Sequence, residues 1–110
     1  MTDVFGDGIN LSGGGSNISI TNSRVGQASR QGIAITNASN VRIDRDTVEM
    51  AHRMGIDLEP YASTDRVDNV WIVNSSICGN YGPISGYAHW GVTNVVILSN
   101  TYCWGGPIAK

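Results

Sequence analysis

The stretch N69-V-W-I72 decides the fold, because its pattern recurs along the chain. An asparagine is followed by an apolar residue, a variable residue and an isoleucine. The counterparts are N17-I-S-I20, N40-V-R-I43 and N94-V-V-I97, so the asparagines lie 23, 29 and 25 residues apart. A second block precedes each of these, in the forms G8-I-N-L11, G32-I-A-I35, G55-I-D-L58 and a weaker G82-P-I-S85. The fixed order of the two blocks indicates four repeat units.

Each unit predicts two short strands whose apolar residues alternate with polar ones, separated by turns rich in Gly, Asn and Ser. A unit of about 23 residues cannot bury its own apolar face, whereas units stacked about 4.8 Å apart build a continuous core. The sequence therefore predicts parallel coils in which Ile20, Ile43, Ile72 and Ile97 form one column. A leucine-rich repeat is a poor alternative, since the chain has only three leucines.

This double block resembles the repeats of right-handed parallel β-helix proteins of the pectate-lyase-like superfamily, over residues 6–104. The resemblance implies an all-β fold, a right-handed parallel β-helix (solenoid) of about four coils. The single domain 1–110 would divide into units 6–29, 30–52, 53–79 and 80–105. Because the superfamily includes polysaccharide lyases, glycoside hydrolases, epimerases and phage tail spikes, the resemblance implies a carbohydrate-binding or carbohydrate-processing module. The alternative is a non-catalytic structural or receptor-binding segment of a phage tail fibre or surface adhesin.

Charge and hydropathy argue against two classes of partner. The net charge is −2 and Lys110 is the single lysine, whereas binding to nucleic acid or to an anionic membrane surface requires a basic patch. No apolar run of about 18 residues is present, so we expect no membrane span. The resemblance favours an extracellular or virion-associated location.

The alternation also predicts which side chains point outward. On the first strand the outward columns are Asn10, Ala34, Asp57 and then Ser12, Thr36, Glu59. On the second strand they are Ser19, Arg42, Trp71, Val96 and then Thr21, Asp44, Val73, Leu98. Because these last columns become apolar in the third and fourth units, we expect a partner to cover them. Open solenoid ends need covering too, so we expect self-association or further coils, and an incomplete or oligomeric β-helix.

Candidate chemistry gathers in the third unit, which also has the longest connection, from Leu58 to Asn69. For a hydrolase, Asp57 with Glu59 or Asp44 would supply acid and base. For a lyase or epimerase, His52, Tyr61 or Arg66 would remove a proton, while Arg or bound Ca²⁺ neutralised a uronate. The competing interpretation is that these outward acids are only solvated and that His52 is a turn residue.

The sequence also suggests residues that contact a substrate. These are Asp44, Tyr61, Trp71 and Trp90. The aromatic rings can stack on sugar faces, but the rings near the C-terminus can equally close the core or pack against a partner. No His, Cys and carboxylate spacing matches a zinc site or a calcium loop, so we expect no metal and no cofactor, with Ca²⁺ as the one exception named above.

Cys78 and Cys103 occupy the same place, nine residues after Asn69 and Asn94. Stacked coils would bring their Cα atoms about 5 Å apart, within the range of a disulfide. Oxidation depends on the compartment, and we expect a reduced pair of thiols.

Overall fold

The computed structural model of the protein describes residues 6–103 and 108–109. Thirteen strands, β1 to β13, follow one another among these residues, and none of the described residues is helical. They form three sheets, in which every pairing is parallel. The all-β fold class expected from the sequence is confirmed.

The first sheet has the order β1-β4-β7-β10-β13, the second β2-β5-β8-β11 and the third β3-β6-β9-β12. The first sheet consists of β1 (Ile9–Leu11), β4 (Ile33–Ile35), β7 (Met54–Leu58), β10 (Gly82–Ser85) and β13 (Ile108–Ala109). The second consists of β2 (Gly15–Thr21), β5 (Ala38–Asp44), β8 (Val67–Val73) and β11 (Val92–Leu98). The third consists of β3 (Arg24–Gly26), β6 (Thr47–Ala51), β9 (Ser76–Gly79) and β12 (Thr101–Tyr102).

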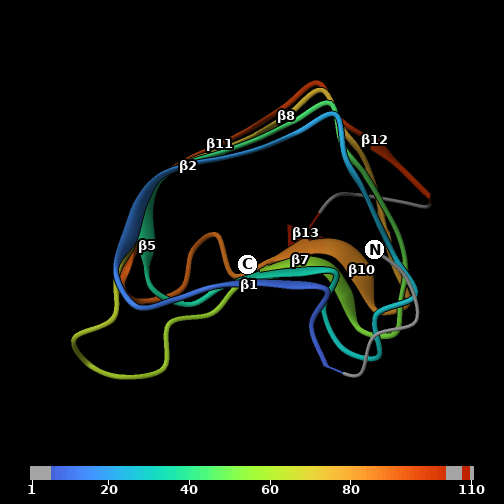
Figure 1. The fold of residues 1–110 in the computed structure, drawn as a ribbon. Helices are drawn as coiled ribbons and strands as arrows, with labels where there is room; N and C mark the ends of the chain where they lie inside the picture. The colour runs from blue at the N-terminus through green and yellow to red at the C-terminus, as the bar shows by residue number, and fades with distance from the viewer. Residues whose placement is uncertain (1–5, 104–107, 110) are drawn as a thin grey trace.

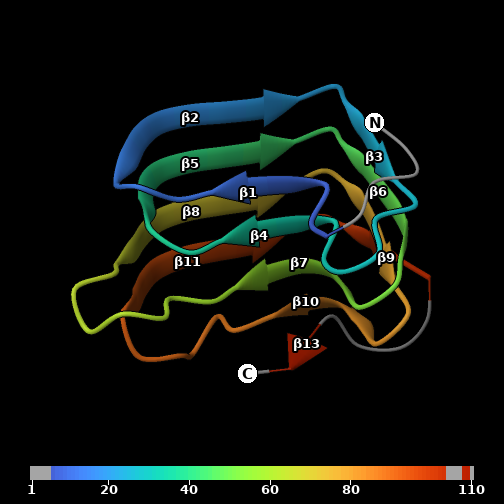
Figure 2. The ribbon, with the colours of Figure 1, turned by 60° about the horizontal axis from the view of Figure 1, so that its bottom comes forward.

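The chain visits the first, second and third sheets in turn and then returns to the first. Figure 1 shows the resulting three-sided coil nearly end-on, with equivalent strands lying over one another. Figure 2 shows the first sheet in front, its strands stacked in order. Each coil therefore places its strands beside those of the preceding coil, as a parallel β-solenoid requires.

The predicted isoleucine column exists. Ile20 pairs with Ile43, Ile43 with Ile72, and Ile72 with Ile97. Ile43 and Ile72 are 0% exposed, whereas Ile20 and Ile97 are half-buried because each has a coil on only one side. Full burial of such a side chain contributes about 1.5–3 kcal/mol, so these columns are a main source of stability.

The repeated asparagines also form a column, and the structure explains why the repeat needs them. Asn17, Asn40, Asn69 and Asn94 all adopt positive φ, between 54° and 57°, a conformation that asparagine tolerates better than most residues. Asn40 Nδ2 donates to Asn17 Oδ1 at 3.2 Å, and Asn69 Nδ2 donates to Asn40 Oδ1 at 2.8 Å. Asparagine therefore provides both the local backbone shape and the bond between coils.

A second polar column lies at the corner between the second and third sheets. The backbone N–H of Ser23 donates to Asp46 Oδ1, that of Asp46 to Ser75 Oγ, and that of Ser75 to Asn100 Oδ1, at 2.8, 3.1 and 2.9 Å. Each side chain thus satisfies a backbone donor of the coil before it. Asp46 is 2% exposed, and its burial raises the pKa of its carboxyl group.

The weakest repeat block has a different register from the one predicted. Gly82 pairs with Met54 rather than with Gly55, and Ile84 pairs with Ile56. The physical reason is that buried Ile84 continues the apolar column of the first sheet, which shifts the glycine by one position. Ile84 is 0% exposed.

Four of the predicted outward positions are in fact buried. Ala34, Thr36, Asp44 and Val73 are 0%, 6%, 7% and 4% exposed. Ala34 is small and lies between the larger Asn10 and Asp57. Asp44 is enclosed because Asn74 donates to its Oδ1 at 3.1 Å, and the guanidinium groups of Arg42 and Arg45 flank it. The apolar surface expected in coils three and four is therefore smaller than predicted and includes exposed Trp71 and Leu98.

Cys78 and Cys103 are joined by a disulfide with a Cα–Cα distance of 5.4 Å. The predicted stacking of the two residues is confirmed, but the expectation of reduced thiols is wrong. Tyr102 pairs with Ile77, so the next residue of each coil stands opposite its counterpart and the two sulfur atoms meet.

Candidate functional site

The carboxyl groups of Asp57 and Glu59 lie on the outer face of the first sheet, at the end of β7. Ile56 and Leu58 are 0% exposed in the core, and alternation along the strand turns Asp57 and Glu59 to the other side. The N–H of Glu59 donates to Ile35 O at 2.9 Å, which extends the strand pairing beyond Leu58. The longest connection between the first and second sheets, residues 59–66, starts at this point and projects from the coil (Figure 2).

Asp57 is held in place by side chains of two neighbouring coils. Gln31 Nε2 donates to Asp57 Oδ2 at 3.1 Å, and Ser85 Oγ donates to Asp57 Oδ1 at 2.6 Å. Gln31 is buried, and its Oε1 accepts the N–H of Met54 at 2.8 Å. The carboxylate therefore has a fixed position on the sheet.

Glu59 is in a different environment from Asp57. Its Oε1 is shielded from solvent and has no hydrogen-bond partner. Burial, and then the neighbouring Asp57 carboxyl group, raise the pKa of Glu59 to about 7, while a hydrogen bond from Tyr61 acts in the opposite direction. Glu59 therefore keeps its proton close to neutral pH, where an ordinary glutamate is ionised.

An ion pair that sequence reasoning missed flanks these carboxyl groups. Arg30 Nε lies 3.7 Å from Asp7 Oδ1, and the N–H of Gln31 donates to the same oxygen at 3.2 Å. The negative charge of Asp7, and then a hydrogen bond to Tyr61, raise the pKa of the Arg30 guanidinium group, and the nearby Glu59 adds to this effect. Asp7 and Arg30 precede β1 and β4 in turns that carry no distinctive motif, so only the stacking of coils brings them to the site.

A hollow of about 540 Å³ lies between the 59–66 connection and the segment from Trp90 to Thr93. It is lined by Tyr61, Ser63, Arg66, Trp90, Gly91 and Thr93. Two of these side chains, Tyr61 and Trp90, are large aromatics that are 64% and 50% exposed. The structure thus brings together three of the predicted site residues, Tyr61, Arg66 and Trp90, from two loops far apart in sequence.

The loop that carries Tyr61 is held by its own polar groups. Asp65 Oδ2 accepts the N–H groups of Tyr61 and Ala62 at 3.1 and 2.9 Å. Arg66 Nη1 donates to the carbonyl oxygens of Ser63 and Asp65 at 2.8 and 2.6 Å. Arg66 therefore stabilises the loop, which fixes Tyr61 at the edge of the hollow.

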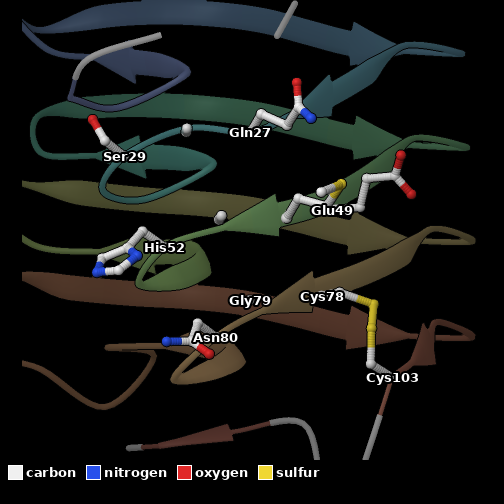
Figure 3. A pocket seen from close by; sticks show the side chains of 11 residues that line it. Gln27, Ser29, Glu49, His52, Cys78, Gly79, Asn80 and Cys103 are labelled. Carbon is white, nitrogen blue, oxygen red and sulfur yellow. A yellow bond between two sulfur atoms is a disulfide. The ribbon is translucent and has the colours of Figure 1, made fainter. Parts of the chain in front are cut away.

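Three other predicted site residues lie elsewhere. Asp44 ends β5 in the second sheet, and Trp71 faces outward from β8 of that sheet with the Arg42 guanidinium 5.5 Å from its ring centroid. His52 lines a separate groove of about 730 Å³ beside the third sheet, on the side of Ser29 and Asn80 and away from the disulfide (Figure 3). The structure does not bring these residues to Asp57 and Glu59.

Metal-binding clusters and membrane-spanning helices are both absent from residues 6–103 and 108–109. No three His, Cys, Asp or Glu side chains of the described residues are arranged to hold a metal ion. None of the described segments is a helix of the length and apolarity needed to cross a membrane.

The fold and site define a class of protein, a parallel β-solenoid with carboxyl groups on the outside of one sheet and aromatic side chains in the connections that follow its strands. The chain belongs to the family described as the right-handed β-helix region, and the match covers residues 1–103. This confirms the fold expected from the repeats. No curated protein and no solved structure matches the chain.

Proposed function

We propose that the protein binds and processes a carbohydrate at Asp57, Glu59 and the adjacent hollow. The observation that carries this proposal is the position of Tyr61, which is near enough to Glu59 to influence its pKa and also lines the hollow with Trp90. Exposed aromatic rings bind the apolar faces of sugars, and a carboxyl group that titrates near pH 7 is suited to proton transfer. One side chain thus connects a surface for a sugar ring with a group that can transfer a proton.

Glu59 is the proposed proton donor to the departing sugar oxygen, because it holds its proton near neutral pH. As the glycosidic C–O bond breaks, water adds to the anomeric carbon, and the proton that this water releases returns to the Glu59 carboxylate. Asp57 is the second cause of the raised pKa of Glu59, after burial. The role of Asp57, held by Gln31 and Ser85, is to tune Glu59 and to accept a hydrogen bond from substrate or water. Arg66 holds the loop, and the proposal gives no direct role to His52, Asp44 or Trp71.

The test is to measure new reducing ends and unsaturated products with a panel of neutral and acidic polysaccharides. Replacing Glu59 by Gln removes the proton donor and is expected to lower turnover by about 100-fold or more, with Asp57→Asn also impaired. The matched control is Glu49→Gln, whose carboxylate pairs with Arg24 on the third sheet. Wild-type turnover by Glu59→Gln, or no turnover of any glycan by the folded wild-type protein, contradicts the catalytic part of the proposal.

A second candidate function is a non-catalytic structural or receptor-binding segment. The observation that favours it is the exposure of Trp71 and Leu98 on the second sheet, 39% and 59% respectively. Exposed apolar side chains on one surface are typical of contact with a partner. Light scattering across a range of concentrations tests this function. A stable oligomer that dissociates in Leu98→Ser, without turnover of any glycan, supports the structural function over the enzymatic one.

A further inference from the structure

The charges around the site point to the kind of sugar it accepts. Among residues 6–103 and 108–109, carboxyl groups outnumber guanidinium groups around the site. The acids are Glu59 itself, its neighbours Asp7 and Asp57, Asp65 of the 59–66 connection, and Asp68 next to the hollow. The cations are Arg30 and Arg66. Asp68 belongs to this set because its Oδ1 accepts a hydrogen bond of 2.6 Å from the hydroxyl group of Thr93, which lines the hollow.

Both guanidinium groups already have partners within the protein. Arg30 lies next to Asp7, and its Nε is shielded from solvent and has no hydrogen-bond partner. Arg66 Nη1 donates to two backbone carbonyl groups of its own loop. These carbonyl groups are neutral, so the excess of carboxyl groups among the described residues is what opposes a carboxylate brought in by a ligand.

We propose that the site accepts neutral saccharides and disfavours uronates. This inference rests on the proposed function and specifies its substrate class. A uronate would place its carboxylate beside Asp57 and Asp7, where carboxyl groups outnumber guanidinium groups among the residues that the structure describes, and such like-charge contacts oppose binding. The hydroxyl groups of a neutral sugar, by contrast, can donate to these same carboxylates while a ring face stacks on Tyr61 or Trp90.

The experiment compares binding within matched pairs of oligosaccharides by calorimetry. Each pair consists of an oligouronate and its carboxyl-reduced counterpart, which has the same linkages without the charge. The neutral member is expected to bind about tenfold more tightly, with the ratio falling as salt screens the repulsion. Equal or tighter binding of the acidic member overturns the inference but leaves the carbohydrate function standing. Failure of every pair to bind overturns both.

A variant tests the physical cause. Asp7→Asn removes the partner of Arg30 and one negative charge, so the ratio of neutral to acidic affinity is expected to fall severalfold. Glu49→Gln removes a negative charge from the third sheet and is expected to leave the ratio unchanged. An unaltered ratio in Asp7→Asn, with folding verified by circular dichroism, contradicts the account of Arg30.

Discussion

Glu59 follows Asp57 by two residues on the outer face of the first sheet, and the two carboxyl groups have opposite surroundings. Gln31 and Ser85 each donate a hydrogen bond to Asp57, whereas Glu59 Oε1 is shielded without a partner. Burial and the proximity of Asp57 raise the pKa of Glu59 to about 7. Two acids of nearly identical chemistry therefore differ because of their contacts, and this difference makes the pair suitable for proton transfer.

The raised pKa of Glu59 predicts a dependence of stability on pH. The unfolded carboxyl group titrates near 4.5 and the folded one near 7, so the folded state binds the proton more tightly. The stabilisation is complete below pH 4.5 and is lost as pH rises to about 7. Because the side chain is partly solvated, we expect a loss of about 1 kcal/mol. Chemical unfolding from pH 4 to 8 measures it, and Glu59→Gln should flatten this part of the profile. An equal slope in the variant and wild type contradicts the assignment.

The isoleucine column predicts a graded response to truncation. Ile43→Ala removes a 0% exposed side chain with coils on both sides, and is expected to cost about 3–4 kcal/mol of unfolding free energy. Ile20→Ala, in the same column but half-buried, is expected to cost about half as much. Urea denaturation of both variants measures the difference. Equal costs at the two positions are incompatible with a column whose outermost member is less enclosed.

The asparagine column predicts that the positive φ of each asparagine and its side-chain hydrogen bonds make separate contributions to the free energy of unfolding. Asn40 has φ of 54° and exchanges side-chain hydrogen bonds with Asn17 and Asn69. Asn40→Ala loses both contributions and is expected to destabilise the protein by about 2 kcal/mol. Asn40→Gly keeps access to positive φ and is expected to lose only about half of that. The prediction fails if thermal or urea unfolding finds the glycine variant as unstable as the alanine one.

The disulfide predicts a redox-dependent stability. Cys78 and Cys103 are 25 residues apart, and closing a loop of this length contributes about 3 kcal/mol in the chain-entropy description. Denaturation with and without reductant measures this contribution. The control is the double variant Cys78→Ser with Cys103→Ser. Its stability should match that of the reduced wild-type protein and should not change when reductant is added. A wild-type protein that is indifferent to reductant contradicts the prediction.

Much of the fold was predictable because a solenoid repeats one local rule. The repeated block of asparagine, apolar residue, variable residue and isoleucine fixes a positive backbone φ at the asparagine, an inward apolar pair and the strand register. The predicted partners of Ile43 and Ile72 were all confirmed. The fourth unit was predicted less well, since Gly82 does not occupy the place of Gly55. The register of a strand is set by the side chains that it buries. The spacing of the glycines did not indicate which residue of the fourth block would be buried.

The site was predictable only in part, because alternation gives direction but not enclosure. Asp57 and Glu59 were placed on one outward face by their spacing. Asp44 was also predicted to point outward, but Asn74 and two neighbouring arginines enclose it, and no local pattern indicates the contact with Asn74, 30 positions away. Asp7 and Arg30 were missed for the same reason. The redox state of Cys78 and Cys103 depends on more than spacing, so their stacking was predictable and their bond was not.

The most direct test of the central claim is a carbon-detected NMR titration of the Glu59 carboxyl group. We expect a midpoint near pH 7 in the wild-type protein. In Asp57→Asn we expect a lower midpoint, still above the ordinary value because burial remains. A wild-type midpoint near 4.5 would mean that Glu59 is an ordinary solvated carboxylate at neutral pH, which contradicts its role as the proton donor.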